Sequence, residues 1–436
     1  MEIRDPVHGS IHIISEEIPV IMNPFFQRLR GIKQLGFSEY AFPGATHSRF
    51  LHSIGVMHIG EKVFNKLFHN QLNDPEFKKL KHTFKMACLL HDIGHAPLSH
   101  STEIVMPKLK ELKFPEKSLQ NWGKGPEDQA SHEDYTVKSI LDSPFSKAFS
   151  ELESKFGIEI NSIADLIIGV TSYSSYFTIK GINYFPLLHQ LVSSEMDCDR
   201  MDYLLRDSYF CGVSYGNYDL DWLLDNLEVC IKNSKASLGI SERAVVTFDD
   251  FLLSRYHMFI MVYFHYRAVC LEQLLYKYFR DSPEEYTIPG DIEKYLEHDD
   301  HYLMKILRKS KNPYAQDIVQ NKIPQKIFES FNQGQLKKLE QVQLYLEQEN
   351  IDFIKCSSSS RLSKYYKNSP LKKERVTPPL QVVRKTYEKS KVSYSNIDEA
   401  TDLFQKFSKS HAINRLHCEI KELSEKQKNE LRNLIQ

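Results

Sequence analysis

The stretch LLHDIGHAPLSH, residues 89–100, places a His-Asp doublet directly after two leucines. The preceding residues have the apolar spacing of a helix, so the leucines direct the end of this helix into the core. His91 and Asp92 then enter an apolar environment, where polar groups are costly unless they are paired or bound to a ligand. An imidazole nitrogen and a carboxylate oxygen are ligands that a borderline divalent cation accepts. His52 and Asp199, from other predicted helices, are the candidates to complete a set of two neutral and two anionic ligands.

Helical spacing of apolar residues extends outward from this stretch, from Ser48 to about residue 280. The clearest segments are 54–68, 163–170, 187–207 and 248–278. Before them, residues 3–13 alternate in hydropathy around a Pro and Gly turn, which predicts a short hairpin.

The last third of the chain predicts a mixture of helices and strands. Residues 282–335 have the pattern of further short helices. Val382, Val383 and the alternation at 392–394 predict strands, while 397–407 and 419–435 predict helices. We therefore expect a mainly α fold with a small α+β C-terminal appendage. Its predicted parts are a catalytic core with the N-terminal hairpin (1–280), a helical extension (281–350) and an α+β subdomain with a basic segment (351–436).

Composition restricts the class of protein and its location. The 436 residues carry 56 Lys and Arg against 57 Asp and Glu, and this balance excludes a whole-chain argument for binding nucleic acid or an anionic membrane. No apolar run approaches the roughly 20 residues that cross a bilayer, and no cationic leader opens the chain, so no membrane partner is expected. The seven scattered cysteines contain no C-x-x-C pair and predict buried thiols in a reducing compartment. We expect a cytoplasmic protein.

A second polar cluster predicts a pocket in the helical core. Asp199, Tyr203 and Asp207 recur at four-residue steps and so share one helical face. Leucine and methionine residues flank this face, which is typical of a pocket wall rather than a solvated surface. A second wall with the same spacing is formed by Arg255, Phe259 and Tyr263.

Two other polar groups have simpler interpretations. Asp202 and Arg206, at i and i+4, are interpreted as an ion pair only. The sequence HDDH at 298–301 has the residue types of a metal site, but it opens a predicted helix, where Asp caps are expected. A structural role is therefore favoured for both groups.

Several motifs occur in one order over the first 280 residues. They are DPVHG (5–9), FQRLR (26–30), KQLG (33–36), FPGA (42–45), HSRFLHSIGV (47–56), HDIGHAPLSH (91–100), DRMDY (199–203) and FCGVSYG (210–216). Together they resemble the HD-domain deoxynucleotide triphosphohydrolases, a family that includes vertebrate SAM-and-HD-domain enzymes and bacterial dGTPase-like HD phosphohydrolases. The resemblance covers residues 2 to about 280, and the C-terminal third matches weakly.

The resemblance implies an all-helical HD-domain core that hydrolyses a deoxynucleoside triphosphate to deoxynucleoside and inorganic triphosphate. The divalent cation (Mn, Fe, Mg, Zn or Ni) would be held by His52, His91, Asp92 and Asp199. The catalytic group would be His95, His100, Glu103 and His132. Substrate contacts would come from Gln34, Leu35, Arg49, Arg200, Tyr203, Asp207 and Tyr263. The family's oligomeric habit implies a homo-oligomer, with a nucleotide activator as a further partner.

The chemistry of these residue types agrees with such a reaction. A cation between phosphate oxygens polarises the α-phosphorus and acidifies a bound water. A histidine near its reference pKa of about 6.5 can protonate the departing 5′-oxygen at neutral pH, and Glu103 is placed to orient His132. Arg49 and Arg200 would offset the triphosphate charge. Tyr263 packed against C2′ would exclude a ribose 2′-hydroxyl.

Several positions depart from the pattern of the vertebrate enzyme. Glu103 replaces an Asp and Arg200 replaces a Lys, so both positions keep their charge. Phe259 replaces a His that contacts the nucleotide, so that contact must differ. Met22 replaces the acid that reads guanine in the activator site, although Gln27 and Arg30 remain. The change at Met22 argues against a guanine-nucleotide activator.

Two alternative functions stay open. The first is an HD phosphohydrolase that acts on another nucleotide or phosphoester, because the His-Asp motif does not select the substrate. The second is a nucleotide sensor or single-stranded nucleic-acid binder with a vestigial metal site. This alternative is supported by the segment 361–391, which contains ten Lys and Arg but only two acidic residues. Tyr365, Tyr366 and Tyr387 lie among these basic residues. Such a run is more often a solvated surface, so binding of nucleic acid is not favoured.

Overall fold

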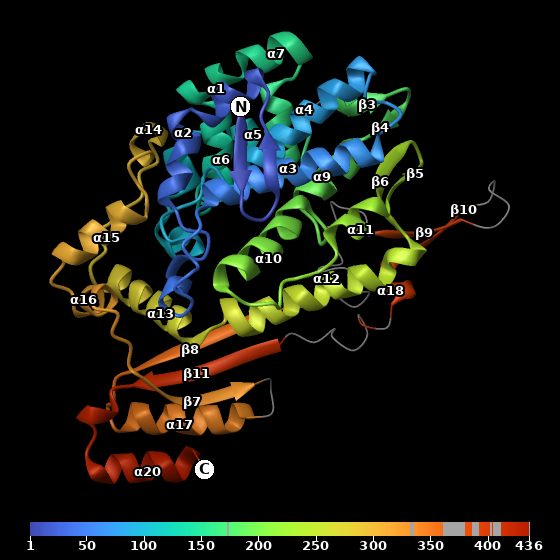
Figure 1. Ribbon diagram of the computed structural model, residues 1–436. Coiled ribbons are helices and arrows are strands. Elements are labelled where there is room, and N and C mark those ends of the chain that lie inside the picture. Colours follow the sequence, from blue (N-terminus) through green and yellow to red (C-terminus); the bar gives the residue numbers. More distant parts are fainter. Residues whose placement is uncertain are drawn as a thin grey trace.

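The computed structural model describes residues 1–171, 174–331, 335–360, 380–385, 392–401, 403 and 411–435 (Figure 1). Helices form most of this part of the chain, so the predicted mainly α fold is confirmed. The main body contains α1 (Ile18–Ile21), α2 (Pro24–Gln27), α3 (Arg49–Leu67), α4 (Pro75–Leu90), α5 (Glu116–Asn121), α6 (His132–Leu141), α7 (Ser150–Phe156), α8 (Ile160–Ile168), α9 (Phe185–Val192), α10 (Cys198–Cys211), α11 (Leu220–Asp225), α12 (Val245–Met258) and α13 (Tyr266–Asp281).

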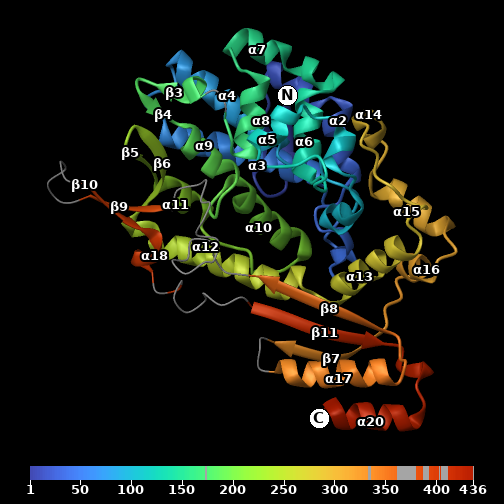
Figure 2. The same ribbon diagram turned by 180° about the vertical axis from the view of Figure 1, so that it is seen from behind.

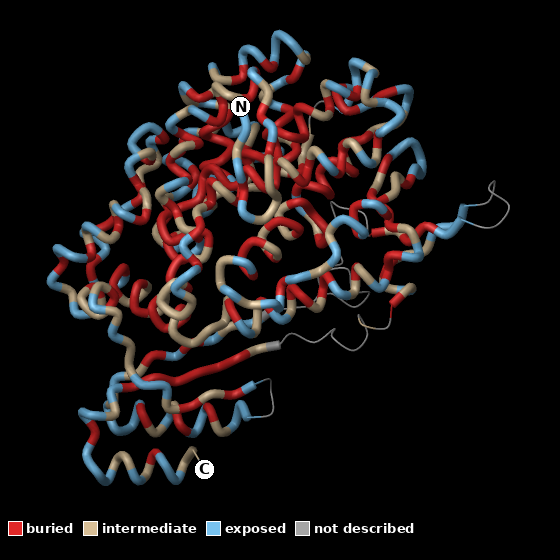
Figure 3. Tube along the Cα trace, in the orientation of Figure 1, coloured by how far each residue is buried: buried red, intermediate tan, exposed pale blue. Residues whose placement is uncertain are grey.

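The elements that carry the predicted metal ligands pack together in the main body. α3 lies against both α10 and α4, the helix that ends directly before His91. Buried residues concentrate in this region (Figure 3). α4 begins at Pro75, where the Asp74 side chain accepts a hydrogen bond from the amide of Glu76. Leu89 and Leu90 at its other end are fully buried. The His-Asp doublet therefore follows a helix that ends in the core, as predicted.

The N-terminal hairpin is confirmed. Strands β1 (Glu2–Asp5) and β2 (Gly9–His12) pair antiparallel, with Ile3 opposite Ile11. The buried Asp5 at its turn reaches α10, where it pairs with Arg206 at 2.8 Å. The hairpin is thus attached to a helix of the candidate site.

Two of the predicted long helices are interrupted. The helix predicted over 187–207 is divided into α9 and α10, because the Asp197 side chain accepts hydrogen bonds from the amides of Ser194 and Arg200 and caps a new helix. The helix predicted over 248–278 is divided by a π-helical turn at Phe259–Tyr263, after which α13 begins. Each interruption turns polar side chains toward the same region of the body.

A mixed sheet takes four of its strands, β3 to β6, from a region where the pattern predicted only helices. Its strands are β3 (Thr178–Ile179), β4 (Ile182–Asn183), β5 (Leu227–Lys232), β6 (Lys235–Ser241), β9 (Gln381–Lys385) and β10 (Val392–Asn396). The order is β10-β9-β6-β4-β3, and β5 forms a hairpin with β6. Asn233 and Ser234 connect β5 to β6 with φ values of 52° and 57°, a two-residue turn that suits the strand twist. The strands predicted at 382–383 and 392–394 are confirmed as β9 and β10.

The region after α13 is only partly helical. Short helices α14 (Ile292–Tyr295), α15 (Asp300–Lys309) and α16 (Pro313–Val319) are present as predicted. Asp299 caps α15 by accepting a hydrogen bond from the Tyr302 amide at 2.9 Å, which confirms the cap interpretation of 298–301. The prediction of helix over 325–331 is wrong, because β7 (Gln325–Phe331) pairs with a strand from the end of the chain. The boundaries of the three predicted parts stay a prediction.

β7 belongs to a three-stranded antiparallel sheet that lies beside α13. Its order is β7-β11-β8, with β8 (Phe353–Ser360) and β11 (His411–Cys418). β8 packs against α13, while α17 (Leu336–Gln348) and α20 (Glu425–Ile435) lie on the side away from the main body (Figures 1 and 2). A small separate core fills the space under these two helices and includes Phe328, Val342, Leu346 and Leu416.

Other C-terminal expectations are met in part. Only α18 (Ile397–Ala400) represents the helix predicted over 397–407, whose later residues lie outside the described part except for Thr401 and Leu403. α20 begins at Glu425, later than the predicted residue 419. Most of the basic segment, with Tyr365, Tyr366 and Tyr387, also lies outside the described residues.

Two further features of the fold concern the length and hydropathy of the helices and the state of the cysteines. Among the described helices, none is long and apolar enough to cross a bilayer. All seven cysteines are free thiols and six of them are buried, as predicted. Cys211 is the partly exposed exception.

Candidate functional site

A cavity of about 420 Å³ opens among the polar residues that the sequence singled out. Its wall contains every predicted site residue except His52 and Glu103, and these two contact residues of the wall. The contributing elements are the segment 34–38, α3, the turns after α4, the start of α6, the ends of α8 and α9, α10, the π-helical turn and α13. Residues far apart in the sequence therefore share one cavity. Their roles stay predictions at this point.

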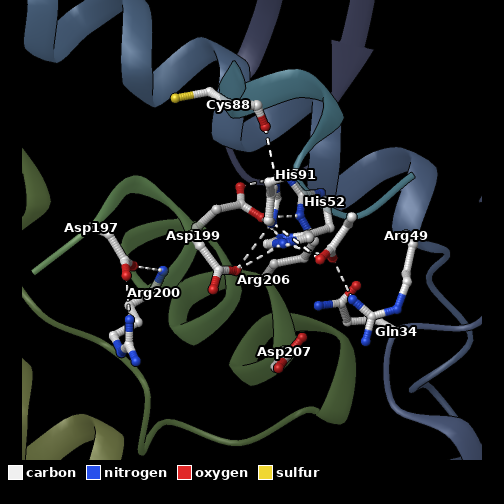
Figure 4. A network of polar contacts seen from close by, with 12 residues as sticks. Gln34, Arg49, His52, Cys88, His91, Asp197, Asp199, Arg200, Arg206 and Asp207 are labelled. Carbon is white, nitrogen blue, oxygen red and sulfur yellow. Dashed lines mark hydrogen bonds and ion pairs between the residues drawn. The ribbon is translucent and has the colours of Figure 1, made fainter. Parts of the chain in front are cut away.

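The four predicted metal ligands lie close together beside this cavity, and Figure 4 shows how His52, His91 and Asp199 point toward one another. His52 comes from α3, His91 and Asp92 directly follow α4, and Asp199 lies in the first turn of α10. Asp199 Oδ1 is 3.0 Å from His52 Nε2 and 3.6 Å from His91 Nε2. Asp92 Oδ2 is 3.6 Å from His52 Nε2, and its Oδ1 is 3.4 Å from His91 Nε2.

The donor set fits a divalent cation. His52 Nδ1 is held by Asp202 at 2.8 Å, and His91 Nδ1 donates to the Cys88 carbonyl at 2.9 Å. These contacts leave Nε2 of each ring directed at the carboxylates, and neither buried Nε2 has a well-aligned hydrogen bond within the described residues. Fixing one ring nitrogen so that the other faces the cation is the usual arrangement of histidine ligands. His52, His91, Asp92 and Asp199 are thus suited to hold the ion together.

The interpretation of Asp202 and Arg206 as an ion pair only is wrong. Arg206 does contact both oxygens of Asp202, at 2.8 and 2.9 Å. The same carboxylate also holds His52 Nδ1 and, at 2.6 Å, His8 Nε2 from the N-terminal hairpin. Asp202 therefore orients His52, a predicted metal ligand, which four-residue spacing alone does not reveal.

The carboxylates around the two imidazoles determine their protonation. Burial disfavours the charged form of His52, but Asp199 and Asp202 outweigh burial and raise the pKa of His52 to about 9. Burial is likewise outweighed by Asp92 and Asp199, which raise the pKa of His91 to about 9. Protons therefore occupy the positions that a cation takes, and binding of the cation must release them.

Asp92 connects the metal ligands with the rest of the cavity. Its Oδ2 accepts a hydrogen bond from the buried Arg49 guanidinium, and its Oδ1 is 3.3 Å from His95 Nε2. Burial opposes ionisation of Asp92, yet Arg49 and the neighbouring histidines hold its pKa well below the usual range. Arg49 is further positioned by a 3.0 Å hydrogen bond from its Nε to Ser99 Oγ.

Three histidines and one glutamate form a second group in the cavity. The rings of His95 and His132 stack with centroids 4.0 Å apart. Glu103 Oε1 contacts Nδ1 of His132, as predicted, and lies 3.1 Å from Nδ1 of His100. Burial and the Arg49 charge lower the pKa of His95, whereas Glu103 outweighs burial and raises the pKa of His132. The two stacked imidazoles thus have pKa values shifted in opposite directions.

A third group contains the residues predicted to contact a sugar. The Tyr263 hydroxyl donates a hydrogen bond to Asp207 Oδ2 at 2.8 Å. The rings of Tyr203 and Tyr263 are arranged edge to face, with their centroids 6.2 Å apart. Asp207 Oδ1 is also 2.7 Å from Nε2 of the buried His47. Gln34 borders the cavity, and its buried Oε1 has no hydrogen bond among the described residues.

Comparison with known proteins identifies two regions of the chain. Residues 49–157 match the HD domain, and residues 219–357 match an HD-associated region. The first match begins at Arg49 and contains His52, His91 and Asp92. The chain thus contains an HD domain followed by an HD-associated region.

Several proteins are similar to this HD-domain chain. Uncharacterized protein YwfO of Bacillus subtilis is 33% identical over 265 residues, which are 60% of this chain and 51% of that protein. The Xenopus laevis protein named deoxynucleoside triphosphate triphosphohydrolase SAMHD1 is 29% identical over 312 residues, 67% of this chain and 47% of that protein. A crystal structure of a hypothetical protein from Aquifex aeolicus covers 99% of each chain with a TM-score of 0.74 and 26% identity. The chain thus spans about half the length of these two curated relatives.

Two polar residues that line the cavity or contact its lining were not predicted as site residues. His47 contacts Asp207, and the motif HSRFLH that contains it was a usable signal. Glu272 on α13 borders the cavity and accepts a 3.2 Å hydrogen bond from Ser101, and burial raises the pKa of Glu272 to about 7. Glu272 has no motif around it, because only the packing of α13 brings it to the cavity.

Proposed function

We propose that this HD-domain protein is a metal-dependent triphosphohydrolase that converts a deoxynucleoside triphosphate to deoxynucleoside and inorganic triphosphate. The supporting observation is that one cavity combines a cation site, two arginines, a histidine-glutamate group and a Tyr263–Asp207 pair. These groups match the parts of such a substrate: phosphates, the scissile ester and a sugar. The names of the vertebrate relatives agree with this substrate class.

The arginines would bind the triphosphate. Arg49 and Arg200 both border the cavity, and each carries a guanidinium that suits bidentate contact with phosphate oxygens. Asp92 and Asp197 hold these guanidinium groups in place. When bound, the divalent cation would polarise the phosphate and lower the pKa of a water molecule.

His132 would donate the proton to the departing 5′-oxygen. Glu103 holds Nδ1 of His132, so Nε2 is left to face a substrate, and the raised pKa keeps a proton available at neutral pH. His95 and His100 surround this ring and restrict its orientation. Glu103 then acts as the residue that positions the acid.

Tyr263 would select the deoxyribose. Its hydroxyl is fixed by Asp207, so the ring cannot easily turn away to make room for a 2′-hydroxyl. Gln34, Leu35 and Tyr203 would form the rest of the sugar pocket, with the unpaired Gln34 Oε1 available to a sugar hydroxyl. Selection against ribonucleotides would thus arise by exclusion.

The alternative of a nucleic-acid binder has less support. Of its basic segment, Arg384 and Lys385 are described, and they pair with Glu242 and Glu228 at 2.6 and 2.5 Å. Their charge is therefore offset within the chain. A homo-oligomer and a nucleotide activator remain part of the proposal through the family resemblance alone.

The test is incubation of the purified chain with Mn²⁺ or Mg²⁺ and each deoxynucleoside triphosphate, singly and mixed, followed by chromatography. We expect deoxynucleoside and triphosphate, with the activity lost in Asp92→Ala and kept in Asp221→Ala, a surface acid paired with Lys62. Activity only in mixtures would indicate an activator. Hydrolysis of another phosphoester instead would overturn the substrate assignment. Salt-sensitive binding of single strands that survives His91→Ala, with no hydrolysis of any substrate, would favour the binder.

A further inference from the structure

A second group of metal-ligating side chains lies outside the cavity wall. Cys270 from α13, Cys356 from β8 and His417 from β11 are all fully buried. One sulfur or ring-nitrogen atom from each lies within 4.8 Å of the other two. The proposed hydrolysis uses none of these residues.

The strand register explains why the two residues of the sheet meet. Cys356 pairs with Arg415 across the β8–β11 ladder, and His417 pairs with Ile354. Because alternate residues share a face, Cys356 and His417 are diagonal neighbours on one face of the sheet. The β7–β11 ladder shifts between Leu416 and His417, an irregularity that re-aims side chains.

The third residue comes from the helix that packs on this face. α13 lies against β8, and Cys270 is buried in its packed side. The sulfurs of Cys270 and Cys356 are in hydrogen-bonding contact. The three residues therefore lie at the junction between the HD body and the C-terminal sheet.

His417 is oriented as a metal-ligating histidine would be. Its Nδ1 is 3.1 Å from the Pro324 carbonyl oxygen, so Nδ1 carries the proton and donates it. Nε2 is then left with a lone pair, fully buried beside the Cys356 side chain, and has no well-aligned hydrogen bond among the residues the structure describes. Because buried polar atoms normally have a well-formed partner, a nitrogen and a sulfur that lie this close without one point to a shared ligand.

We propose that Cys270, Cys356 and His417 bind a Zn²⁺ ion. The two thiolates carry a charge of −2 and the imidazole is neutral, so the complex with Zn²⁺ has no net charge. A neutral complex suits a fully buried position. Tetrahedral Zn²⁺ with bonds of about 2.0–2.3 Å holds its ligand atoms roughly 3.5–3.8 Å apart, which is compatible with three ligand atoms that lie within 4.8 Å of one another. A small ligand such as water would take the fourth position.

The ion would fasten the C-terminal sheet to the catalytic body. One ligand lies on α13 and two on the sheet, so binding energy is available only when sheet and body are docked. α13 also carries Glu272 to the cavity. A zinc ion here would therefore stabilise a helix of the site without entering the reaction.

The test separates this site from the catalytic one. The full chain with His91→Ala and Asp92→Ala is reduced, stripped of metal, and loaded with Zn²⁺ or with Co²⁺. We expect one Zn²⁺ per chain by elemental analysis and, with Co²⁺, the sulfur-to-cobalt charge-transfer absorption that only thiolate ligands produce. In the same background Cys356→Ser and His417→Ala should lose the tightly bound ion.

Cys418→Ala is the matched control, because Cys418 follows His417 on β11 but is buried in the small core on the other face. It should keep both the metal and the absorption. Circular dichroism establishes that each variant is folded, and His417→Gln replaces any variant that is not. A folded background protein without metal or thiolate absorption overturns the proposal, and so does a Cys270–Cys356 disulfide in place of the ion.

Discussion

At the scale of single residues, Asp202 connects the N-terminal hairpin, a charged pair and a metal ligand. Its two oxygens hold His52, His8 and Arg206 with no exposure to solvent. We predict that Asp202→Asn weakens cation binding by about 10- to 100-fold, because the amide no longer fixes His52 with charge. Titration of the metal-free protein with Mn²⁺ measures this, with Asp221→Asn as the surface control. Unchanged affinity in a folded variant would mean that Asp202 does not position the ligand.

The two histidines proposed as metal ligands predict the pH dependence of cation binding. The pKa values of His52 and His91 are raised to about 9, so both rings are protonated in the metal-free protein at pH 7. Because binding displaces these protons, affinity should rise steeply with pH until about pH 9, by up to about 100-fold per pH unit if both are released. The stability of the metal-free protein changes with pH in the opposite direction. The two protonated histidines stabilise the metal-free fold through their carboxylate partners. This stabilisation is fully present below the ordinary pKa of about 6.5 and is lost as pH rises through 9.

Metal titrations at several pH values, together with thermal unfolding of the stripped protein, check both signs. A binding constant that stays flat between pH 7 and 9 would contradict the proton displacement. Chelation experiments should accordingly remove the ion more readily at lower pH.

Tyr263 offers a test of sugar selection. We predict that Tyr263→Ala relaxes discrimination between deoxyribo- and ribonucleoside triphosphates, because the ring that excludes the 2′-hydroxyl is gone. Tyr263→Phe keeps the ring and removes only the hydrogen bond to Asp207, so most of the selectivity should persist. The ratio of kcat/KM for paired substrates measures the effect. An equal ratio in wild type and Tyr263→Ala would remove Tyr263 from this role.

At the scale of elements, the turn after α4 is packed directly on α6. Gly94 lies between Asp92 and His95, and a Cβ here would overlap main-chain atoms of His132 and Thr136. We predict that Gly94→Ala moves α6 away from the turn and separates the stacked rings of His95 and His132. Activity should fall at least about tenfold even where the protein stays folded, since small misplacements of reacting groups are costly.

Comparison with Gly157→Ala controls for glycine loss, because Gly157 ends α7 where an added Cβ meets nothing within 4 Å. Gly157 has a φ of 68°, so that variant should lose some stability but keep activity per folded molecule. Equal specific activities of the two variants would show that α6 adapts to the added group.

At the scale of the whole molecule, the described part of the chain contains two separate apolar cores. The large core fills the main body, while the small one lies between the C-terminal sheet and α17 and α20. We predict that Leu346→Ala, in the small core, destabilises this region by about 2–5 kcal/mol. Hydrogen exchange should then speed up in α17 and β7 before it does in α3 and α4. Uniform acceleration across the chain would show that the two cores unfold as one.

The amino-acid sequence alone determined the helical class, the N-terminal hairpin and the set of residues that meet in the cavity. Apolar spacing identifies helices because each residue's contribution to a buried face is local, and the His-Asp doublet is informative because buried polar groups need partners. Because apolar spacing reports only on local structure, it also explains which elements were predicted wrongly. The breaks that separate α9 from α10 and α12 from α13, and the strands β5 to β7, depend on caps and on partners distant in the chain.

The tertiary structure decided how those residues are connected. Asp202 orients His52, His47 reaches Asp207, and Glu272 arrives at the cavity through contacts between elements far apart in the sequence. Cys270, Cys356 and His417 have no common motif and meet only because α13 packs on a particular face of the β8–β11 ladder. Sequence spacing specifies which side chains share one helix or strand face. It does not specify which face of another element will lie opposite, because that depends on the packing of the whole chain.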